Sequence, residues 1–179
     1  MRQFTLLLFF MSSVLFCFGQ NVYTINDIEQ TTSGFVSKKT KKLLNGELKQ
    51  YYSTGKLKEV IPFKNGVQDG VGKLYYQSGE LEKKLQYKNN KFHGFYKEYH
   101  KNGKLKTSGW YENGLEEGVW KSWDQNGKLS SEFDGFKNGK SEGVMIWYYS
   151  WGEIKSIYKN DKLISRKCFD TRGNQIECE

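Results

Sequence analysis

Residue types that usually carry catalysis or bind metals are scarce in this chain of 179 residues. Histidine occurs twice, as His93 and His100, and cysteine three times. His93 falls at an expected turn and His100 near an expected strand end, where structural roles are favoured. No metal-ligand spacing, phosphate-binding loop or nucleophilic serine motif is recognisable. The sequence therefore predicts a protein that is not an enzyme and that uses no metal and no cofactor.

Long hydrophobic runs are also lacking, except for one at the N-terminus. Arg2 is followed by an almost continuous apolar stretch that ends at Phe18. About 15 apolar residues are too few to span a bilayer comfortably and match the core of a signal peptide. We predict that residues 1–19 are a signal peptide cleaved after Gly19, which places the mature chain in the periplasm or outside the cell. An uncleaved anchor and a lipid attached at Cys17 are the alternatives.

Positive charge exceeds negative charge, with 28 Lys and Arg against 20 Asp and Glu and a formal net charge of +8. These cations are spread over the chain, and export argues against nucleic acid as the partner. One lysine column fits a solvent-exposed strand position and consists of Lys49, Lys73, Lys97 and Lys121. Such a basic surface is suited to contact with an acidic surface of the cell envelope, although contact with a membrane surface is not predicted.

Cys168 and Cys178 are the cysteines that remain after signal cleavage. An even pair of cysteines in an exported chain predicts one disulfide. The segment 170–174 between them has the composition of a hairpin turn. A two-residue loop would place Cys168 opposite Glu177, one residue short of its partner, whereas a bulge or a three-residue loop would bring the two cysteines into register.

Glycine is abundant, with 19 residues, and it recurs with a period of about 24 residues. A leading column consists of Gly46, Gly70, Gly94, Gly118 and Gly143. A second column, expected at hairpin turns, consists of Gly55, Gly79, Gly103, Gly127 and Gly152. A third column contains Asn-Gly or a related pair, beginning with Asn65-Gly66. Glycine and asparagine tolerate the positive φ angles of tight hairpin turns, and no helical apolar stripe survives between them.

Between the turns lie stretches of about six to nine residues, the usual length of strands. Five residues after each leading glycine stands an aromatic ladder of Tyr51, Tyr75, Tyr99, Trp123 and Tyr148. Leu57 and Phe63 are separated by an even number of residues and are expected on one strand face, together with this ladder. We interpret the ladder as core stacking between repeats, with an exposed binding platform as the alternative. Such a binding face would involve the tryptophans of the later repeats, Trp110, Trp120, Trp123, Trp147 and Trp151.

These patterns predict an all-β fold in which a meander of β-hairpins forms one elongated, twisted antiparallel sheet of about five repeats. After the signal peptide, residues 20–45 are expected to be a lead-in, in which 35–44 is the candidate first strand. Residues 46–164 form the expected repeat domain. Residues 165–179 are expected to form a hairpin that caps the exposed last edge of the sheet.

The segment 87–96 resembles the MORN signature, in which an aromatic residue precedes Asn-Gly-x-x-(His)-Gly and a second aromatic residue. Residues 110–120 match the same signature. The longer unit is similar to the bacterial MORN repeat variant that defines proteins catalogued as YwqK-type antitoxin components. Pro62 and Asn90 depart from the pattern of the repeat. The signal peptide is a larger departure, because an antitoxin against a cytoplasmic toxin should stay in the cytoplasm.

The expected function is that of an exported, non-enzymatic MORN-like repeat protein that acts as a protein-interaction or scaffold module of the bacterial cell envelope. The family label implies a first alternative, an antitoxin or immunity-type protein that neutralises a toxin by binding it. The tryptophans suggest a second alternative, a binder of carbohydrate or of a lipid surface. The expected partner is therefore a protein of unknown identity, either an envelope component or a toxin.

Overall fold

The computed structural model describes residues 21–178, so the expected signal peptide lies outside the described residues. Within this range the chain is almost entirely strand and turn. One short 3-10 helix, η1 (Ile25–Asp27), is the sole helical element of the described part. The region from residue 21 to 178 contains no helix that is long and apolar enough to cross a membrane.

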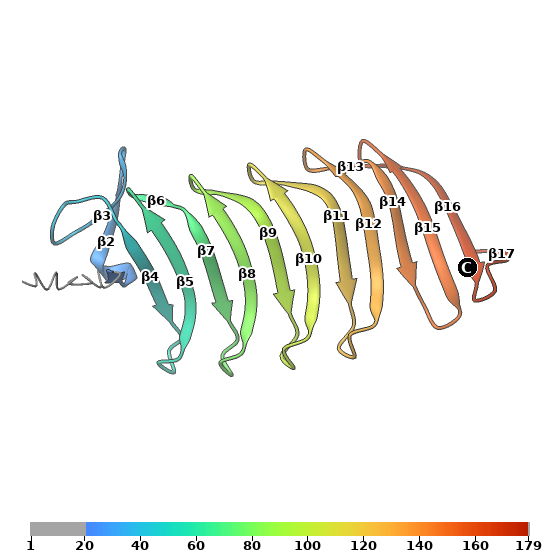
Figure 1. Cartoon of the computed structure of the whole chain (residues 1–179), viewed down its shortest axis with the longest axis horizontal. Helices are drawn as coiled ribbons and strands as arrows, with labels where there is room; N and C mark the ends of the chain where they lie inside the picture. The colour runs from blue at the N-terminus through green and yellow to red at the C-terminus, as the bar shows by residue number, and fades with distance from the viewer. Residues whose placement is uncertain (1–20, 179) are drawn as a thin grey trace, which may run out of the picture.

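One long sheet of 15 strands runs the length of the molecule (Figure 1). The longer strands are β4 (Gly46–Tyr51), β5 (Leu57–Lys64), β7 (Gly70–Tyr75), β8 (Leu81–Lys88), β9 (Lys91–Tyr99), β10 (Leu105–Glu112), β11 (Leu115–Trp123), β12 (Leu129–Lys137), β14 (Gly143–Tyr148), β15 (Gly152–Lys159) and β16 (Lys162–Asp170). The short strands of the same sheet are β1 (Val22–Tyr23), β6 (Val67–Gln68), β13 (Lys140–Ser141) and β17 (Gln175–Ile176). Apart from β1, which pairs with β4 in parallel, paired strands are antiparallel, and the predicted hairpin meander is confirmed.

The lead-in at the N-terminal end differs from the expected strand at 35–44. It forms a separate two-stranded sheet of β2 (Ile28–Thr31) and β3 (Gly34–Ser37). The strand ends early because the chain turns back after Ser37, where the Lys41 N–H donates to the Ser37 carbonyl at 2.8 Å. This lead-in closes the first end of the repeat sheet, and the buried cluster there comprises Ile28, Leu44, Leu48, Ile61 and Phe63.

Two kinds of turn alternate along the meander. The Asn-Gly column forms two-residue hairpin turns in which both central residues have positive φ, for example 54° at Asn113 and 91° at Gly114. The second glycine column occupies the opposite turns at Gly55, Gly79, Gly103 and Gly127. The last member of this column differs, because Gly152 is the first residue of β15. The turn before it is one residue shorter than the others and closes with a bond from the Tyr149 N–H to the Gly152 carbonyl.

The leading glycines lie inside or at the start of strands, each directly opposite an aromatic residue of the next strand. The cross-strand pairs are Gly46 with Phe63, Gly70 with Tyr87, Gly94 with Tyr111, Gly118 with Phe136 and Gly143 with Tyr158. Directly paired residues share a face of the sheet. We call this side the glycine–aromatic face, after these cross-strand pairs.

Two further glycines on this face lie directly under aromatic rings. A Cβ added to Gly72 would lie 2.7 Å from Cε2 of Tyr87, and a Cβ added to Gly109 would overlap the Trp120 indole. Rings then contact one another from strand to strand. The centroid distances along the series are 5.1 Å for Tyr87–Phe92, 5.3 Å for Phe92–Tyr111, 5.2 Å for Tyr111–Trp120, 6.1 Å for Trp120–Phe136, 4.6 Å for Phe136–Phe133 and 6.1 Å for Phe133–Tyr158.

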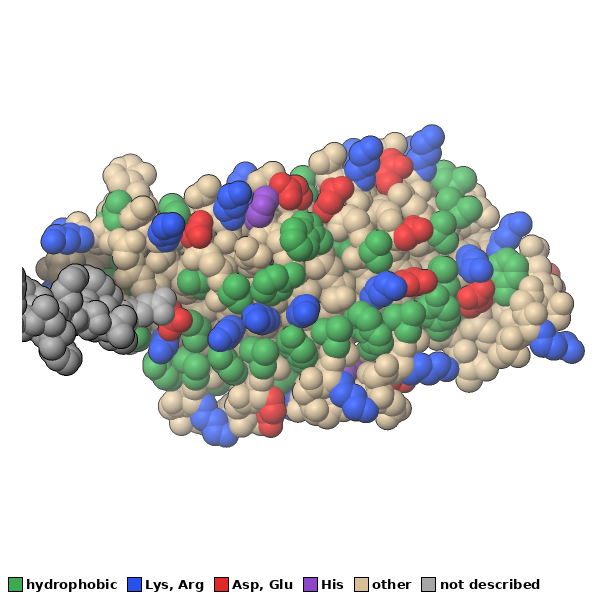
Figure 2. Space-filling view, viewed as in Figure 1, with side chains coloured by type: hydrophobic (Ala, Val, Ile, Leu, Met, Phe, Trp, Pro, Cys, Tyr) green, Lys and Arg blue, Asp and Glu red, His purple; other side chains and the backbone are tan. Residues whose placement is uncertain are grey.

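The expectation that Leu57 and Phe63 share one face with the aromatic ladder is wrong. A one-residue shift between Gln50 and Tyr51 pairs Leu57 with Tyr51, whereas Phe63 pairs with Gly46. Because Gly46 and Tyr51 are an odd number of residues apart on β4, they point to opposite faces. The ladder of Tyr51, Tyr75, Tyr99, Trp123 and Tyr148 therefore lies on the other side of the sheet, which we call the lysine face (Figure 2). The ring stack that links the repeats is built from different aromatic residues.

Side chains at one rim link successive repeats by hydrogen bonds. The Tyr52 hydroxyl donates to the Tyr75 carbonyl at 2.6 Å, and the Tyr76 hydroxyl donates to the Tyr99 carbonyl at 2.7 Å. His100 takes the equivalent position in the next repeat, with Nε2 2.8 Å from the Trp123 carbonyl. Since a carbonyl oxygen can only accept, this contact requires the proton on Nε2. His100 therefore has a structural role in this rim.

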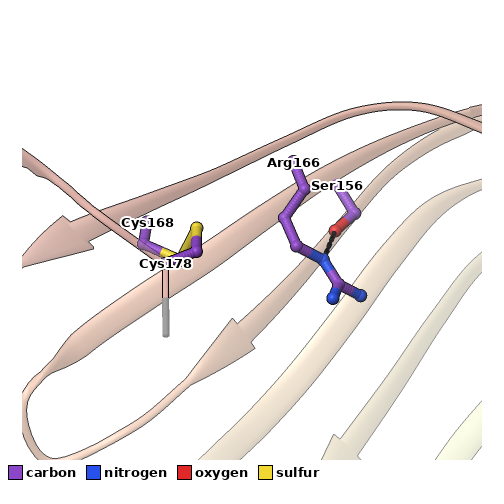
Figure 3. Close-up of a disulfide and its surroundings, with 4 residues drawn as sticks. All are labelled: Ser156, Arg166, Cys168 and Cys178. Atoms are coloured by element: carbon purple, nitrogen blue, oxygen red, sulfur yellow. Dashed lines mark hydrogen bonds between the residues drawn. A yellow bond between two sulfur atoms is a disulfide. The ribbon is translucent and has the colours of Figure 1, made fainter.

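The predicted disulfide is confirmed in the C-terminal hairpin of β16 and β17 (Figure 3). Cys168 pairs across the strands with Ile176, and Cys178 lies two residues beyond, with a Cα–Cα distance of 5.4 Å between the cysteines. The turn is a longer loop that starts at Asp170 and closes at Asn174. On the neighbouring strands, Nε of Arg166 donates to Oγ of the buried Ser156 at 3.3 Å.

The ring packed over Gly109 gives a direct test of the glycine–aromatic face. Gly109→Ala should lower the free energy of unfolding by about 1–3 kcal/mol, because the added methyl group displaces the Trp120 indole. Urea unfolding measures this change. Ser108→Ala, on the same strand but on the lysine face, is the matched control and should change stability by less than about 0.5 kcal/mol. An unchanged urea midpoint for Gly109→Ala would contradict the packing of the Trp120 ring over Gly109.

The disulfide should stabilise the C-terminal hairpin locally. Cys178→Ser leaves Cys168 in place and should cost about 2–3 kcal/mol, the loop-closure estimate for a cross-link of this span. Because repeat arrays are held by neighbour contacts, amide hydrogen exchange should rise in β16 and β17 and stay slow in β7–β10. The reduced wild-type protein should match the variant. Loss of protection throughout the sheet would contradict a local role.

Candidate functional site

The lysine face carries a row of cations that crosses the sheet. By strand register the row contains Lys49, Lys73, Lys84, Lys97, Lys121, Lys155 and Lys167. Figure 2 shows blue side chains in a row along the sheet, beside a band of hydrophobic side chains. The sequence column already contained four of these lysines. Lys84 could be added only from the register, because it comes from the other strand of the repeat.

An apolar row lies beside the lysines on the same face. Phe95 pairs with Trp110, and Val144 pairs with Ile157 further along the sheet. The exposed fractions are 47% for Trp110, 49% for Val119 and 46% for Ile157. Val119 belongs to this row because it lies two residues before Lys121 on β11. The lysine face of the later repeats therefore presents large apolar side chains to solvent.

The five tryptophans do not gather on one surface. Trp110 and Trp123 lie on the lysine face, whereas Trp120 and Trp147 lie on the glycine–aromatic face. The Trp120 indole N–H is buried without a hydrogen-bond partner, which fits a ring held in a stack. Trp151 lies in the turn before β15, where its ring is stacked on Tyr149 at 5.1 Å with an angle of 8° between the planes. Sequence reasoning located the repeats but could not assign faces.

The Tyr149–Trp151 pair lines a depression of about 510 Å³ at the C-terminal end of the sheet. Its other walls come from Ile154, Ile176 and the Cys168–Cys178 disulfide. The lining is mostly apolar, with Glu177 as the one carboxylate among the residues that line it. This shape suits contact with an apolar group better than acid–base chemistry.

On each face of the sheet, some ionisable side chains are hydrogen-bonded to one another. On the lysine face the Tyr148 hydroxyl donates to Glu132 at 2.8 Å, and Lys121 is paired with the same carboxylate at 3.0 Å. Burial, followed by this hydrogen bond, raises the pKa of Tyr148 to about 12. The bond from Lys121 lowers the pKa of Glu132. On the opposite face, burial and the neighbouring Glu98 raise the pKa of Tyr96.

Two carboxyl groups have the opposite shift, because burial raises the pKa of Glu59 and of Glu116. They cannot act as a pair, since Glu59 is on β5 and Glu116 is on β11, with β7 to β10 between them. His93 is 3.5 Å from Glu112 through Nδ1. Within residues 21–178 no group of three or more His, Cys, Asp or Glu side chains is arranged to hold a metal ion.

Comparisons with known proteins give little beyond the repeat. No curated protein matches the chain. One similar solved structure is the GtfA/B complex bound to UDP and GlcNAc, at 12% identity and a TM-score of 0.35, with 63% of this chain covering 25% of that chain. Another is accessory secretory protein 1, 2 and 3 of Streptococcus pneumoniae, at 13% identity and a TM-score of 0.32, with 78% of this chain covering 21% of that chain. The chain thus spans about a quarter or less of each of these structures.

The family model of the MORN repeat variant matches three segments of the chain, at residues 44–65, 68–89 and 116–139. Each segment coincides with one hairpin unit of the sheet, through β4–β5, β6–β8 and β11–β12. The MORN resemblance read from the sequence therefore holds for these three repeats, which are hairpins of a single sheet.

Proposed function

We propose that this chain is an exported, non-enzymatic repeat protein that binds another protein of the bacterial cell envelope and acts there as an interaction or scaffold module. MORN repeats are in general interaction modules for proteins or membranes. The observation that carries the proposal is the apolar row on the lysine face. Trp110, Val119 and Ile157 are each about half exposed although they occupy strand positions in the sheet.

Exposed apolar strand positions of this kind favour a protein partner. Large apolar side chains that occur together on one face mark interaction sites more often than singly exposed ones do. The surrounding lysines add a polar rim, which is the usual surrounding of a partner-binding patch. A tryptophan within the patch supplies the type of side chain that contributes most to such interfaces.

Two features support the exported location in the proposal. The Cys168–Cys178 disulfide fits a non-reducing compartment. The apolar segment that ends near Phe18 has the length of a signal-peptide core. Fractionation of cells, followed by mass determination of the mature N-terminus, tests this part. We expect Gln20 as the first residue, and a full-length chain in the cytoplasm would contradict export.

Site-specific photocrosslinking in intact cells tests the partner. A photoreactive residue at Trp110, Val119 or Ile157 should give one adduct of defined mass, because these positions lie in the proposed interface. Thr107 is the matched control, since it lies on the same strand as Trp110 but on the glycine–aromatic face.

The same experiment separates the proposed function from its alternatives. An adduct with an envelope protein at the three apolar positions and no adduct at Thr107 supports the proposal. An adduct with a toxin would favour the immunity-type alternative instead. Equal adducts at all four positions, or none at any, would contradict an interface on the lysine face.

A further inference from the structure

Three lysines of the lysine face stand directly side by side on three adjacent strands. Lys73 of β7 pairs with Lys84 of β8, and Lys84 pairs with Lys97 of β9. We call these residues the lysine triad. Neighbouring strands are about 4.8 Å apart, and like charges placed directly opposite one another destabilise a sheet. Because this repulsion destabilises the middle of the sheet, we looked for a function that the three lysines serve together.

Three of the other lysines of the row have carboxylate partners, whereas the triad has none. Lys49 lies 3.5 Å from Glu47, Lys121 lies 3.0 Å from Glu132, and Lys155 lies 2.7 Å from Glu153. Among the residues from 21 to 178, no ion pair involves a lysine of the triad. Its cross-strand neighbours at the two ends are Val60 and Ser108, which carry no charge.

Aromatic rings flank the triad on both sides. Tyr75 and Tyr99 follow Lys73 and Lys97 by two residues and therefore lie on the same face. On the other side Phe95 lies under the ammonium group of Lys84, with Nζ 5.6 Å from the ring centroid. Phe95 leads on to the half-exposed Trp110, its cross-strand partner. The cations thus lie between Tyr75 and Tyr99 on one side and Phe95 and Trp110 on the other.

We propose that the lysine triad binds a linear acidic polysaccharide that runs across the strands. A ligand in this direction meets one ammonium group at about every 5 Å. Its carboxylates or sulfates pair with the lysines, and the apolar C–H faces of its sugar rings lie on the flanking aromatic rings. This site adjoins the apolar row of the proposed function at Trp110 and shares its exported location, but it takes a different ligand.

The position of the triad argues against an extended peptide as the ligand. A peptide strand is usually bound by adding to the edge of a sheet, where backbone donors and acceptors are free. The triad lies on β7, β8 and β9, each of which is paired on both sides. Only side chains are therefore available to a ligand on this face, which favours recognition by charge and by ring contact.

Binding of an oligogalacturonate of about ten sugar units to the mature, disulfide-bonded protein tests the inference. Isothermal titration calorimetry should show binding that weakens as salt is raised, because the contacts are between exposed charges. The triple variant Lys73→Gln, Lys84→Gln, Lys97→Gln should lose about tenfold or more in affinity. Its melting temperature without ligand should stay equal or rise, since the repulsion between the lysines is removed.

A matched control removes the same amount of charge elsewhere. Lys64→Gln, Lys88→Gln, Lys137→Gln replaces three exposed lysines next to the Asn-Gly turns, and it should keep nearly full affinity. Equal losses in both triple variants would overturn the site, because net charge alone would then explain binding. Tighter binding of polyglutamate, a single-stranded oligonucleotide or anionic vesicles of equal charge would also overturn it, as would no binding of the oligogalacturonate at low salt.

Discussion

The packing of aromatic rings against one another, and over glycines such as Gly72 and Gly109, is the interaction on which this structure depends. A single sheet has no second layer to bury its side chains, so the rings must pack against the sheet itself and against one another. Glycine makes this possible because a Cβ would occupy the space of the ring, as at Gly109 beneath Trp120. Ring contacts then continue across successive strands, from Tyr87 to Tyr158, and stabilise the packing of each repeat against the next.

The two faces of the sheet therefore have different roles. The glycine–aromatic face holds the repeats together, and its buried side chains include Leu85 and Phe133. The lysine face takes no part in this ring stack. It carries the unpaired lysines of the early repeats and the apolar row of the later ones, the features on which both proposals rest. The closed ends support this division, since the lead-in covers β4 and the disulfide fixes β17 on β16.

The sequence predicts the elements of this fold well, because turns and cross-links depend on local chemistry. The Asn-Gly pairs and the cysteine pair are examples, since positive φ and the reach of a disulfide follow from residue type and spacing. The faces were predicted poorly, because they depend on register. The shift at Gln50 and Tyr51 moves Leu57 to the opposite face from Phe63. The triad was missed for the same reason, since Lys84 joins Lys73 and Lys97 only through strand pairing.

One comparison tests the central claim, that one face builds the fold and the other is free for binding. It is the urea unfolding of Trp120→Ala and Trp110→Ala side by side. We predict that Trp120→Ala loses about 2–4 kcal/mol, because its ring is part of the stack on the glycine–aromatic face. We predict that Trp110→Ala changes stability by less than about 0.5 kcal/mol, because its ring is half exposed on the lysine face. Equal losses in both variants, or a larger loss for Trp110→Ala, would contradict the account.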